Sequence, residues 1–358
     1  MSSKKIVRVG DVLIGGGNPV VIQSMTNVNP LDEIALINQV SALADAGCQI
    51  VRLAVPNMEA AEVFGRVRKK VKIPLVADIH FDYRLAIAAL ERGADKIRIN
   101  PGNIGSIDKV RKVVKAAGER GVPIRVGVNS GSLEKDILSK RGGVDAEGLA
   151  ESAIRNLRMI EDMGYDNLII SLKSSDVAMN YKAHKIIARK TDHPIHIGIT
   201  EAGTPETGRL KSGIGLGALL LEGIGDTMRV SLTADPLEEV KFAKDILYAL
   251  GMRKDKVNLV SCPTCGRTSI DLVGLANKVE EALKREKIND PITVAIMGCV
   301  VNGPGEAKEA DYGIAGGIGK GIIFSKGEVL ETVEEEKLLD ELIKIIKTDR
   351  TNKYGKRQ

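Results

Sequence analysis

Residues 74–129 read PLVADIHFDYRLAIAALERGADKIRINPGNIGSIDKVRKVVKAAGERGVPIRVGVN. Three short runs rich in β-branched residues lie in this stretch, at 74–78, 95–99 and 123–128, and helical patterns separate them. In residues 106–119, apolar side chains recur at spacings of three and four, as on the buried face of a helix. Strand and helix therefore alternate, which predicts parallel strands joined by helices.

The same alternation extends in both directions along the chain. Further strands are predicted at 19–24, 49–54, 167–172, 195–199 and 227–232. Gly47 and Gly164 stand where glycines end helices. Eight strand–helix units over about 250 residues are typical of a (β/α)8 TIM-type barrel. A doubly wound open sheet is the alternative, but no glycine-rich dinucleotide turn follows the first strand, and this favours closure.

A smaller α/β region follows the barrel. Strands are predicted at 257–261, 292–296 and 321–324, with helices at 269–286 and 333–347. We expect a barrel at 1–255, a second domain at 256–349 and a basic tail at 350–358. The stretch AGGIGKG at 315–321 lacks the P-loop spacing and is interpreted as glycine turns.

Composition excludes several classes of protein. The chain has 358 residues, of which 43% are hydrophobic and 3% aromatic, and its formal net charge is +5. This hydrophobic content excludes a disordered chain, and no apolar run approaches the roughly 18 residues of a membrane span. No signal peptide is visible, so we expect a cytoplasmic protein. The few aromatic residues argue against single-stranded nucleic acid as a ligand.

Cationic residues stand in or just after five predicted strands: Arg52, Arg98, Arg125, Lys173 and Arg229. The C-terminal strand ends of a closed barrel form its active mouth, so these side chains should converge there. A buried charge is costly unless it is paired or bound to a ligand. One such cation is typical of a structural ion pair, whereas five predict an anion site, and the arginine fork suits phosphate. We therefore expect a substrate with more than one phosphoryl group.

Other polar residues follow the same strands. His80 is either an acid–base group or a hydrogen-bonded wall residue. Glu201 is either a proton donor or a counter-ion of the cations. The remaining candidates near the strand ends are Asp78, Asn129 and Ser231.

Three of the four cysteines lie in the second region. Cys262 and Cys265 form the motif CPTC, and Cys299 follows in the glycine-rich stretch GCVVNGPGE. A structural zinc site needs four ligands, but all four histidines lie upstream, and Cys48 is expected to be a core thiol. Three thiolate ligands instead favour a [4Fe-4S] cluster with one distinct iron. Glu306, just past the GPG turn, is the nearest carboxylate that could coordinate this iron.

Six motifs together resemble the 4-hydroxy-3-methylbut-2-enyl diphosphate synthase family of the non-mevalonate isoprenoid pathway. They are VADIHFDYR, KIRINPGNIG, RVGVNSGSL, HIGITEAG, CPTCGR and GCVVNGPGEA. The resemblance covers nearly the whole chain and is closest to the short two-domain bacterial form. One departure is Val28, where the family pattern has threonine.

The resemblance implies an iron–sulfur oxidoreductase that opens the ring of 2-C-methyl-D-erythritol 2,4-cyclodiphosphate with two electrons and releases water. It implies reduced flavodoxin or ferredoxin as the electron donor. By similarity, the ligands of the [4Fe-4S] cluster are Cys262, Cys265, Cys299 and Glu306. The diphosphate-binding positions are Arg52, Arg98, Arg125, Asn129, Lys173, Arg229 and Ser231. The polar mouth residues are Asp78, His80 and Glu201, with Glu201 as the candidate proton donor.

Connectivity adds one expectation. The last barrel helix, at about 236–250, should run from the mouth to the opposite end, so the cysteines of one chain would lie far from its cations. We therefore expect a head-to-tail homodimer with two-fold symmetry, in which each subunit supplies its cysteines to the partner's barrel. Two other functions stay open at this point, a zinc-dependent lyase acting on a phosphorylated substrate and an iron–sulfur RNA-binding regulator.

Overall fold

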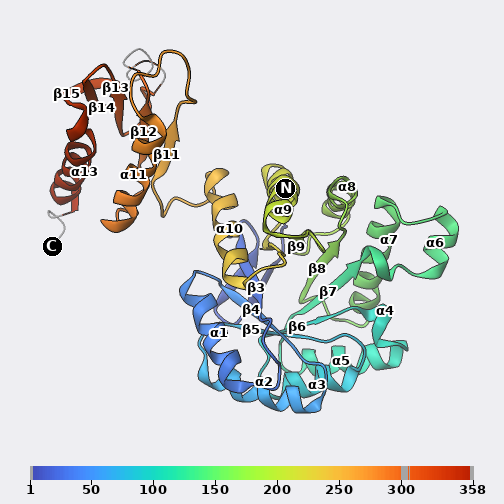
Figure 1. Cartoon of the computed structure of the whole chain (residues 1–358). Helices are drawn as coiled ribbons and strands as arrows, with labels where there is room; N and C mark the ends of the chain where they lie inside the picture. Colours follow the sequence, from blue (N-terminus) through green and yellow to red (C-terminus); the bar gives the residue numbers. More distant parts are fainter. Residues whose placement is uncertain (1–2, 300–304, 306, 355–358) are drawn as a thin grey trace. The chain divides into compact units, whose positions relative to one another are not determined.

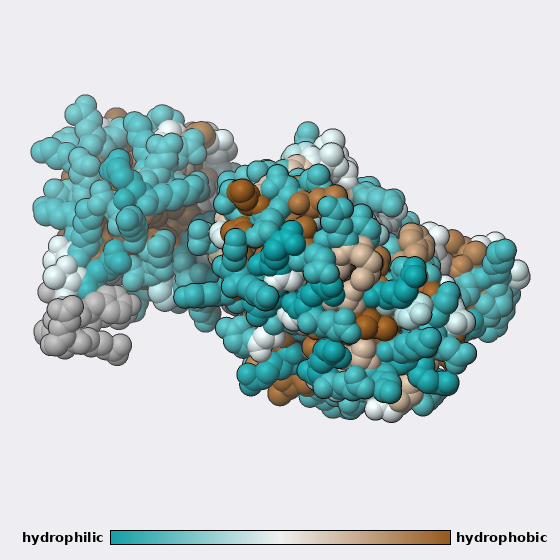
Figure 2. All heavy atoms as spheres, turned by 90° about the horizontal axis from the view of Figure 1, so that it is seen from below, coloured by the Kyte–Doolittle hydropathy of each residue, from teal (hydrophilic) through white to brown (hydrophobic). Residues whose placement is uncertain are grey.

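The computed structural model describes residues 3–299, 305 and 307–354. The chain divides into two compact units, Met1–Met252 and Arg253–Gln358. No helix in the described part of the chain is both long and apolar enough to cross a membrane. The face drawn in Figure 2 is mostly hydrophilic, with hydrophobic areas that are small and scattered.

Eight parallel strands of the first unit close into a barrel in the order β10-β3-β4-β5-β6-β7-β8-β9 (Figure 1). The strands are β3 (Val21–Met25), β4 (Ile50–Ala54), β5 (Leu75–Asp78), β6 (Lys96–Ile99), β7 (Ile124–Asn129), β8 (Leu168–Lys173), β9 (Ile195–Gly198) and β10 (Thr227–Arg229). Each lies at a predicted strand position. The TIM-type barrel is therefore confirmed, and the open-sheet alternative is wrong.

Helices surround the strands and begin soon after them. They are α1 (Glu33–Asp45), α2 (Met58–Lys70), α3 (Tyr83–Glu91), α4 (Pro101–Ile104), α5 (Ile107–Gly118), α6 (Lys135–Arg141), α7 (Ala146–Glu161), α8 (Val177–Ala188), α9 (Pro205–Leu221) and α10 (Pro236–Ala249). Several start at an Asp or Asn whose side chain accepts a backbone N–H of the first turn; Asp32, for example, accepts from Ala35. Gly47 and Gly164 have positive φ beyond α1 and α7, as predicted.

A short antiparallel hairpin closes the end of the barrel opposite the mouth. It consists of β1 (Ile6–Val9) and β2 (Val12–Gly15). Its buried side chains form one apolar cluster with residues from the first half of four barrel strands: Val7, Val9, Ile14, Val21, Ile50, Val76 and Ile169. The end of the barrel opposite the mouth, its bottom, is therefore filled by apolar side chains. Polar groups in the barrel interior are accessible to solvent or ligand from the mouth.

The second unit is built on a five-stranded sheet with the order β11-β12-β13-β14-β15. Its strands are β11 (Asn258–Ser261), β12 (Thr293–Met297), β13 (Tyr312–Gly316), β14 (Lys320–Ser325) and β15 (Glu328–Glu334). The first three are parallel and the last two antiparallel. Helices α11 (Leu272–Arg285) and α13 (Leu338–Tyr354) share an apolar core with this sheet.

Two features of this unit differ from the sequence expectation, and a third agrees with it. Strands β13 and β15 were not predicted. The final helix begins at Leu338 and extends to Tyr354, because residues 328–334 form β15. The stretch AGGIGKG contains the end of β13, a turn and the start of β14, which confirms the interpretation as a glycine turn.

Candidate functional site

The five predicted cations lie inside the barrel. Arg52 is on β4, Arg98 on β6, Arg125 on β7, Lys173 on β8 and Arg229 on β10. Arg98 stands directly opposite Arg125 in the strand register. The first four are at most 8% exposed. Sequence reasoning therefore placed these cations correctly, and the structure brings them together within one interior.

Two glycines make room for these long side chains. A Cβ atom on Gly127 of β7 would lie 2.9 Å from Nε of Arg98, and one on Gly198 of β9 would lie 3.0 Å from Nζ of Lys173. Contacts below about 3 Å require a neighbour to move. Glycine at these two positions therefore leaves room for the side chains of Arg98 and Lys173.

Asp78, at the end of β5, is a shared counter-ion. Its carboxylate lies 3.8 Å from Nε of Arg52, 3.4 Å from NH1 of Arg98 and 3.4 Å from Nε2 of His80. Burial alone would raise the pKa of Asp78, but Arg52, the hydrogen bond to His80 and Arg98 hold it well below its ordinary value. Asp78 is therefore a carboxylate that anchors the cations and stays ionised at neutral pH.

Glu239 on α10 is a second counter-ion, which sequence reasoning missed. It lies 3.2 Å from Nε of Arg229, and it accepts hydrogen bonds from the Ser24 hydroxyl and the Leu232 backbone N–H. At 3% exposed it is more deeply buried than a residue on an amphipathic surface helix would be. It fixes Arg229 at the end of β10.

Lys96 on β6 is a further buried cation that was not predicted. It is fully buried, and its Nζ donates to Oε1 of Gln23 at 3.1 Å. Gln23 lies on β3, which is not a neighbour of β6, so the bond crosses the barrel interior. Burial, followed by Arg125 and Arg52, lowers the pKa of Lys96 well below its ordinary value.

Positive charge exceeds negative charge in this interior. In the described part of the chain, the buried or nearly buried cations of this interior outnumber its two buried carboxylates, Asp78 and Glu239, which pair with Arg52, Arg98 and Arg229. The six cations are Arg52, Lys96, Arg98, Arg125, Lys173 and Arg229. Burial lowers the pKa of Arg52 to about 10 and those of Arg125 and Lys173 well below their ordinary values. Such an excess is favourable only when anions enter the site.

Arg125 has donors ready for such an anion. Its guanidinium is 1% exposed, and its Nε and NH1 atoms find no hydrogen-bond partner among the described residues. An unpaired buried donor is costly. A phosphoryl oxygen would satisfy these donors, because guanidinium and phosphate form short, charge-assisted hydrogen bonds.

The other predicted mouth residues stand at or just after the C-terminal ends of barrel strands. Asn129 ends β7 opposite Lys173, and Ser231 follows β10. The His80 side chain is 55% exposed beyond β5. Glu201 follows β9, is exposed and has a φ of 50°, a left-handed conformation that is uncommon for a residue with a side chain. Such strain is often found at functional sites.

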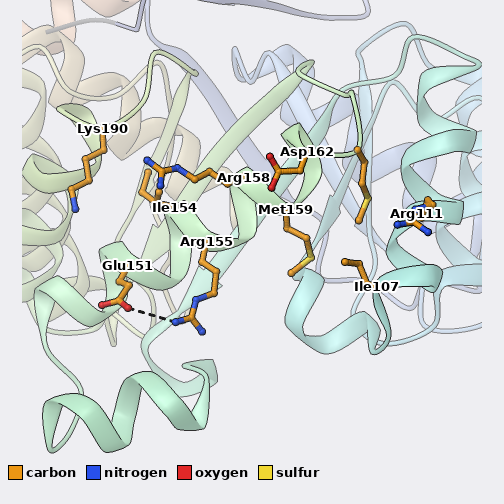
Figure 3. A pocket seen from close by; sticks show the side chains of 10 residues that line it. Ile107, Arg111, Glu151, Ile154, Arg155, Arg158, Met159, Asp162 and Lys190 are labelled. Carbon is orange, nitrogen blue, oxygen red and sulfur yellow. Dashed lines mark ion pairs between the residues drawn. The ribbon is translucent and has the colours of Figure 1, made fainter.

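A separate pocket of about 730 Å³ lies on the outside of the barrel, between α5 and α7 (Figure 3). Arg155 and Glu151 form an ion pair there, with 3.5 Å between NH2 and Oε1. None of the predicted site residues lines this pocket. This outer pocket is therefore separate from the anion site predicted at the barrel mouth.

The cysteines of the second unit stand on neighbouring loops. Cys262 directly follows β11 and Cys299 comes just after β12, and these strands are adjacent and parallel. The loops are joined by two hydrogen bonds, from Gly298 N–H to Sγ of Cys262 at 3.2 Å and from Ser269 N–H to the Gly298 carbonyl at 3.2 Å. Cysteines from both loops thus lie at the same end of the sheet, after the C-terminal ends of β11 and β12.

Cysteine thiolates are the usual ligands of iron–sulfur clusters. Cys265 is exposed, and hydrogen bonding to the backbone of Arg267 and to Thr268 lowers the pKa of its thiol, which favours the thiolate that binds metal. Among the described residues, no three Cys, His, Asp or Glu side chains are grouped closely enough to hold a metal ion. Glu306, the predicted fourth ligand, lies outside the described residues. Cys48 is a core thiol, 5% exposed, as predicted.

Comparison with known proteins covers both units. Residues 4–244 match the model of the GcpE TIM-barrel domain, and residues 258–348 match that of the GcpE protein C-terminal domain. A relative from Fusobacterium nucleatum, named 4-hydroxy-3-methylbut-2-en-1-yl diphosphate synthase (flavodoxin), is 54% identical over 98% of each chain. A relative of the same name from Caldanaerobacter subterraneus is 54% identical over 95% of each chain.

Among solved structures, type I 3-dehydroquinate dehydratase from Clostridium difficile superposes with a TM-score of 0.52. It is 17% identical, and the match covers 70% of this chain and 98% of that one. This likeness concerns the barrel fold alone. The family models and the whole-length relatives, in contrast, show that the chain belongs to the GcpE family, and both relatives carry the name 4-hydroxy-3-methylbut-2-en-1-yl diphosphate synthase (flavodoxin).

Proposed function

We propose that this protein converts 2-C-methyl-D-erythritol 2,4-cyclodiphosphate into 4-hydroxy-3-methylbut-2-enyl diphosphate and water. The reaction consumes two electrons and two protons. The observation that carries this proposal is the buried excess of cations at the barrel mouth, in a chain 54% identical to relatives named for this product. The same similarity gives no support to a zinc-dependent lyase or to an RNA-binding regulator.

The barrel is the substrate-binding domain in this proposal. A cyclic diphosphate brings two phosphoryl groups, which match the arginine-rich interior in charge and in hydrogen-bonding capacity. The residues that would bind them are Arg52, Arg98, Arg125, Asn129, Lys173, Arg229 and Ser231. Buried arginines held by Asp78 and Glu239 are already in place before the ligand arrives, which lowers the entropy lost on binding.

Proton delivery is assigned to the rim of the mouth. A proton must reach the hydroxyl that leaves as water, and Glu201 stands on the loop after β9 with its side chain exposed. His80 and Asp78 form a hydrogen-bonded pair after β5, which lies across the barrel from β9. We assign Glu201 as the proton donor, with His80 and Asp78 as polar groups that orient the substrate.

The second unit is the cluster domain in this proposal. Cys262, Cys265, Cys299 and Glu306 would hold a [4Fe-4S] cluster, which supplies the electrons when bound. The shared end of the sheet and the lowered pKa of the Cys265 thiol support this assignment. Reduced flavodoxin is the proposed donor, since the name of the relatives specifies it.

A head-to-tail homodimer completes the proposal. Helix α10 starts beyond the mouth end of β10 and has 14 residues, so it runs back along the barrel by about 21 Å. The first unit ends three residues later, at Met252. The chain thus leaves the barrel away from its mouth, which supports a cluster domain supplied by the partner subunit. A chain that is monomeric by light scattering at concentrations where it is fully active would contradict this arrangement.

The activity can be tested with anaerobically purified protein. We expect a brown protein with broad absorption near about 400 nm that bleaches with dithionite, as iron–sulfur proteins do. It should form the allylic diphosphate from the cyclic diphosphate when reduced flavodoxin is supplied. Cys299→Ser should lose the colour, whereas Glu201→Gln should keep the colour and lose turnover. A colourless protein with stoichiometric zinc would overturn the proposal, and a fully active Glu201→Gln would overturn the assigned proton donor.

A further inference from the structure

Met25, the last residue of β3, lies between two of the mouth arginines. Its sulfur accepts N–H groups from Arg52, with distances of 3.1 Å to Nε and 3.0 Å to NH2. NH1 of Arg229 lies 3.6 Å from the same sulfur. β3 is flanked in the barrel by β10 and β4, so one side chain meets arginines from both neighbouring strands.

A thioether is an unusual partner for a buried guanidinium. Sulfur in methionine is only a weak hydrogen-bond acceptor, so it orients the N–H groups without neutralising their charge. The carboxylate nearest to Arg52, on Asp78, is farther away at 3.8 Å. Arg229 is held from its other side by Glu239 at 3.2 Å. The donors turned toward Met25 therefore stay available for a stronger acceptor.

We propose that Met25 is a positioning residue for the anion site, which turns Arg52 and Arg229 toward one phosphoryl group and yields its place to that group. This inference rests on the proposed function, in which the mouth binds a diphosphate. A phosphoryl oxygen forms charge-assisted hydrogen bonds with guanidinium groups, and these are much stronger than contacts to a thioether. The exchange of acceptors is therefore favourable, and the two arginines have little reorganisation to make.

Methionine suits this role better than the residues closest to it in size. Leucine has nearly the same volume but offers no acceptor, so the guanidinium groups would lose their common partner. Glutamine has a similar length, but its amide oxygen is a strong acceptor and would compete with phosphate for the same N–H groups. A glutamate would neutralise the site. The sulfur of Met25 is thus suited to this role because it accepts too weakly to compete with phosphate for the guanidinium N–H groups.

The test is the affinity of the full-length protein for inorganic pyrophosphate, measured by isothermal titration calorimetry, together with KM and kcat for the cyclic diphosphate. We expect Met25→Leu to weaken pyrophosphate binding about three- to tenfold and to raise KM by a similar factor, with kcat nearly unchanged. Met25→Gln should weaken pyrophosphate binding at least as much. Met159→Leu on the outer face of α7 is the matched control and should behave as wild type.

The outcomes separate this inference from the proposed function. If the wild-type protein does not bind pyrophosphate, the anion site itself is wrong. If the wild type binds pyrophosphate and Met25→Leu binds it equally well or more tightly, only the role of Met25 is wrong. Thermal unfolding identifies a folding defect in Met25→Leu. In that case Met25→Gln, which keeps the length of the side chain, decides the question: unchanged or tighter pyrophosphate binding by this variant overturns the role of Met25, and weaker binding supports it.

Discussion

Asp78 illustrates how one side chain supports the whole mouth. Its pKa is held well below the ordinary value by Arg52, His80 and Arg98 despite the opposing effect of burial. A carboxyl group with a depressed pKa in the folded state stabilises the fold above its unfolded pKa of about 3.9, and this stabilisation is lost as the pH falls toward the folded value. The barrel should therefore become less stable in acid as this counter-ion is protonated.

Replacing this carboxylate should be costly at neutral pH. We expect Asp78→Asn to lower the free energy of unfolding of the barrel by about 3 kcal/mol, because it leaves buried cations without their partner. Denaturant unfolding at pH 7 measures the loss, and added pyrophosphate should restore part of it. Asp192→Asn is the control, since Asp192 pairs with Lys4 at the surface. Equal effects of the two substitutions would contradict the role assigned to Asp78.

The cysteines should differ sharply in reactivity. Burial raises the pKa of Cys48 to about 11, whereas hydrogen bonding lowers that of the exposed Cys265. With iron removed and all thiols reduced, we expect iodoacetamide to modify Cys265 first at mildly alkaline pH, since the thiolate is the nucleophile. Cys48 should react only after unfolding. Mass spectrometry of the digested protein reads out the order, and early modification of Cys48 would contradict its place in the core.

Sequence reasoning at this scale found the five cations and Asp78, but it missed Glu239 and Met25, the partners of Arg229 and Arg52. Arg52, Arg98 and Arg125 stood out because arginine is rare within buried strands. Glu239 did not stand out, because a glutamate in the first turn of a helix is ordinary and only the packing of α10 on the barrel brings it to Arg229. Met25 did not stand out either, since methionine is a common core residue.

At the scale of elements, periodicity predicted all eight barrel strands but missed the β1–β2 hairpin. The barrel strands were recognised by their alternation with helices, but no helix separates β1, β2 and β3, so this pattern does not identify the hairpin. The structure of the hairpin strands depends on apolar packing with strands far along the chain, since Ile14 belongs to the same bottom cluster as Ile169 of β8. Local sequence does not contain that information.

The hairpin should contribute stability and not affinity. Ile14 is fully buried in the bottom cluster, so Ile14→Ala should lower the free energy of unfolding by about 3 kcal/mol through the lost contacts and the cavity left behind. Pyrophosphate affinity of the folded protein should stay unchanged. Leu13→Ala, on the more exposed neighbour in β2, should cost less than about 1 kcal/mol. A weaker pyrophosphate affinity in Ile14→Ala would show that the bottom of the barrel influences the mouth.

At the scale of the whole molecule, the proposed dimer makes a quantitative prediction about mixed subunits. Arg125→Met should disable a barrel and Cys299→Ser a cluster domain, so each variant alone should be inactive. If each site combines a barrel with the partner's cluster domain, a mixed dimer has one intact site, because the intact barrel of one chain meets the intact cysteines of the other. Equal co-expression makes half of the dimers mixed, and we expect about a quarter of wild-type activity. If barrel and cysteines of the same chain work together, the mixture stays inactive.

The control places both substitutions in one chain and co-expresses it with wild type. A dimer with shared sites then retains about a quarter of the wild-type activity, whereas chains that work independently retain about half. Activity per total protein in these two mixtures therefore decides whether the two units that the fold separates along the chain meet again through a second copy of it.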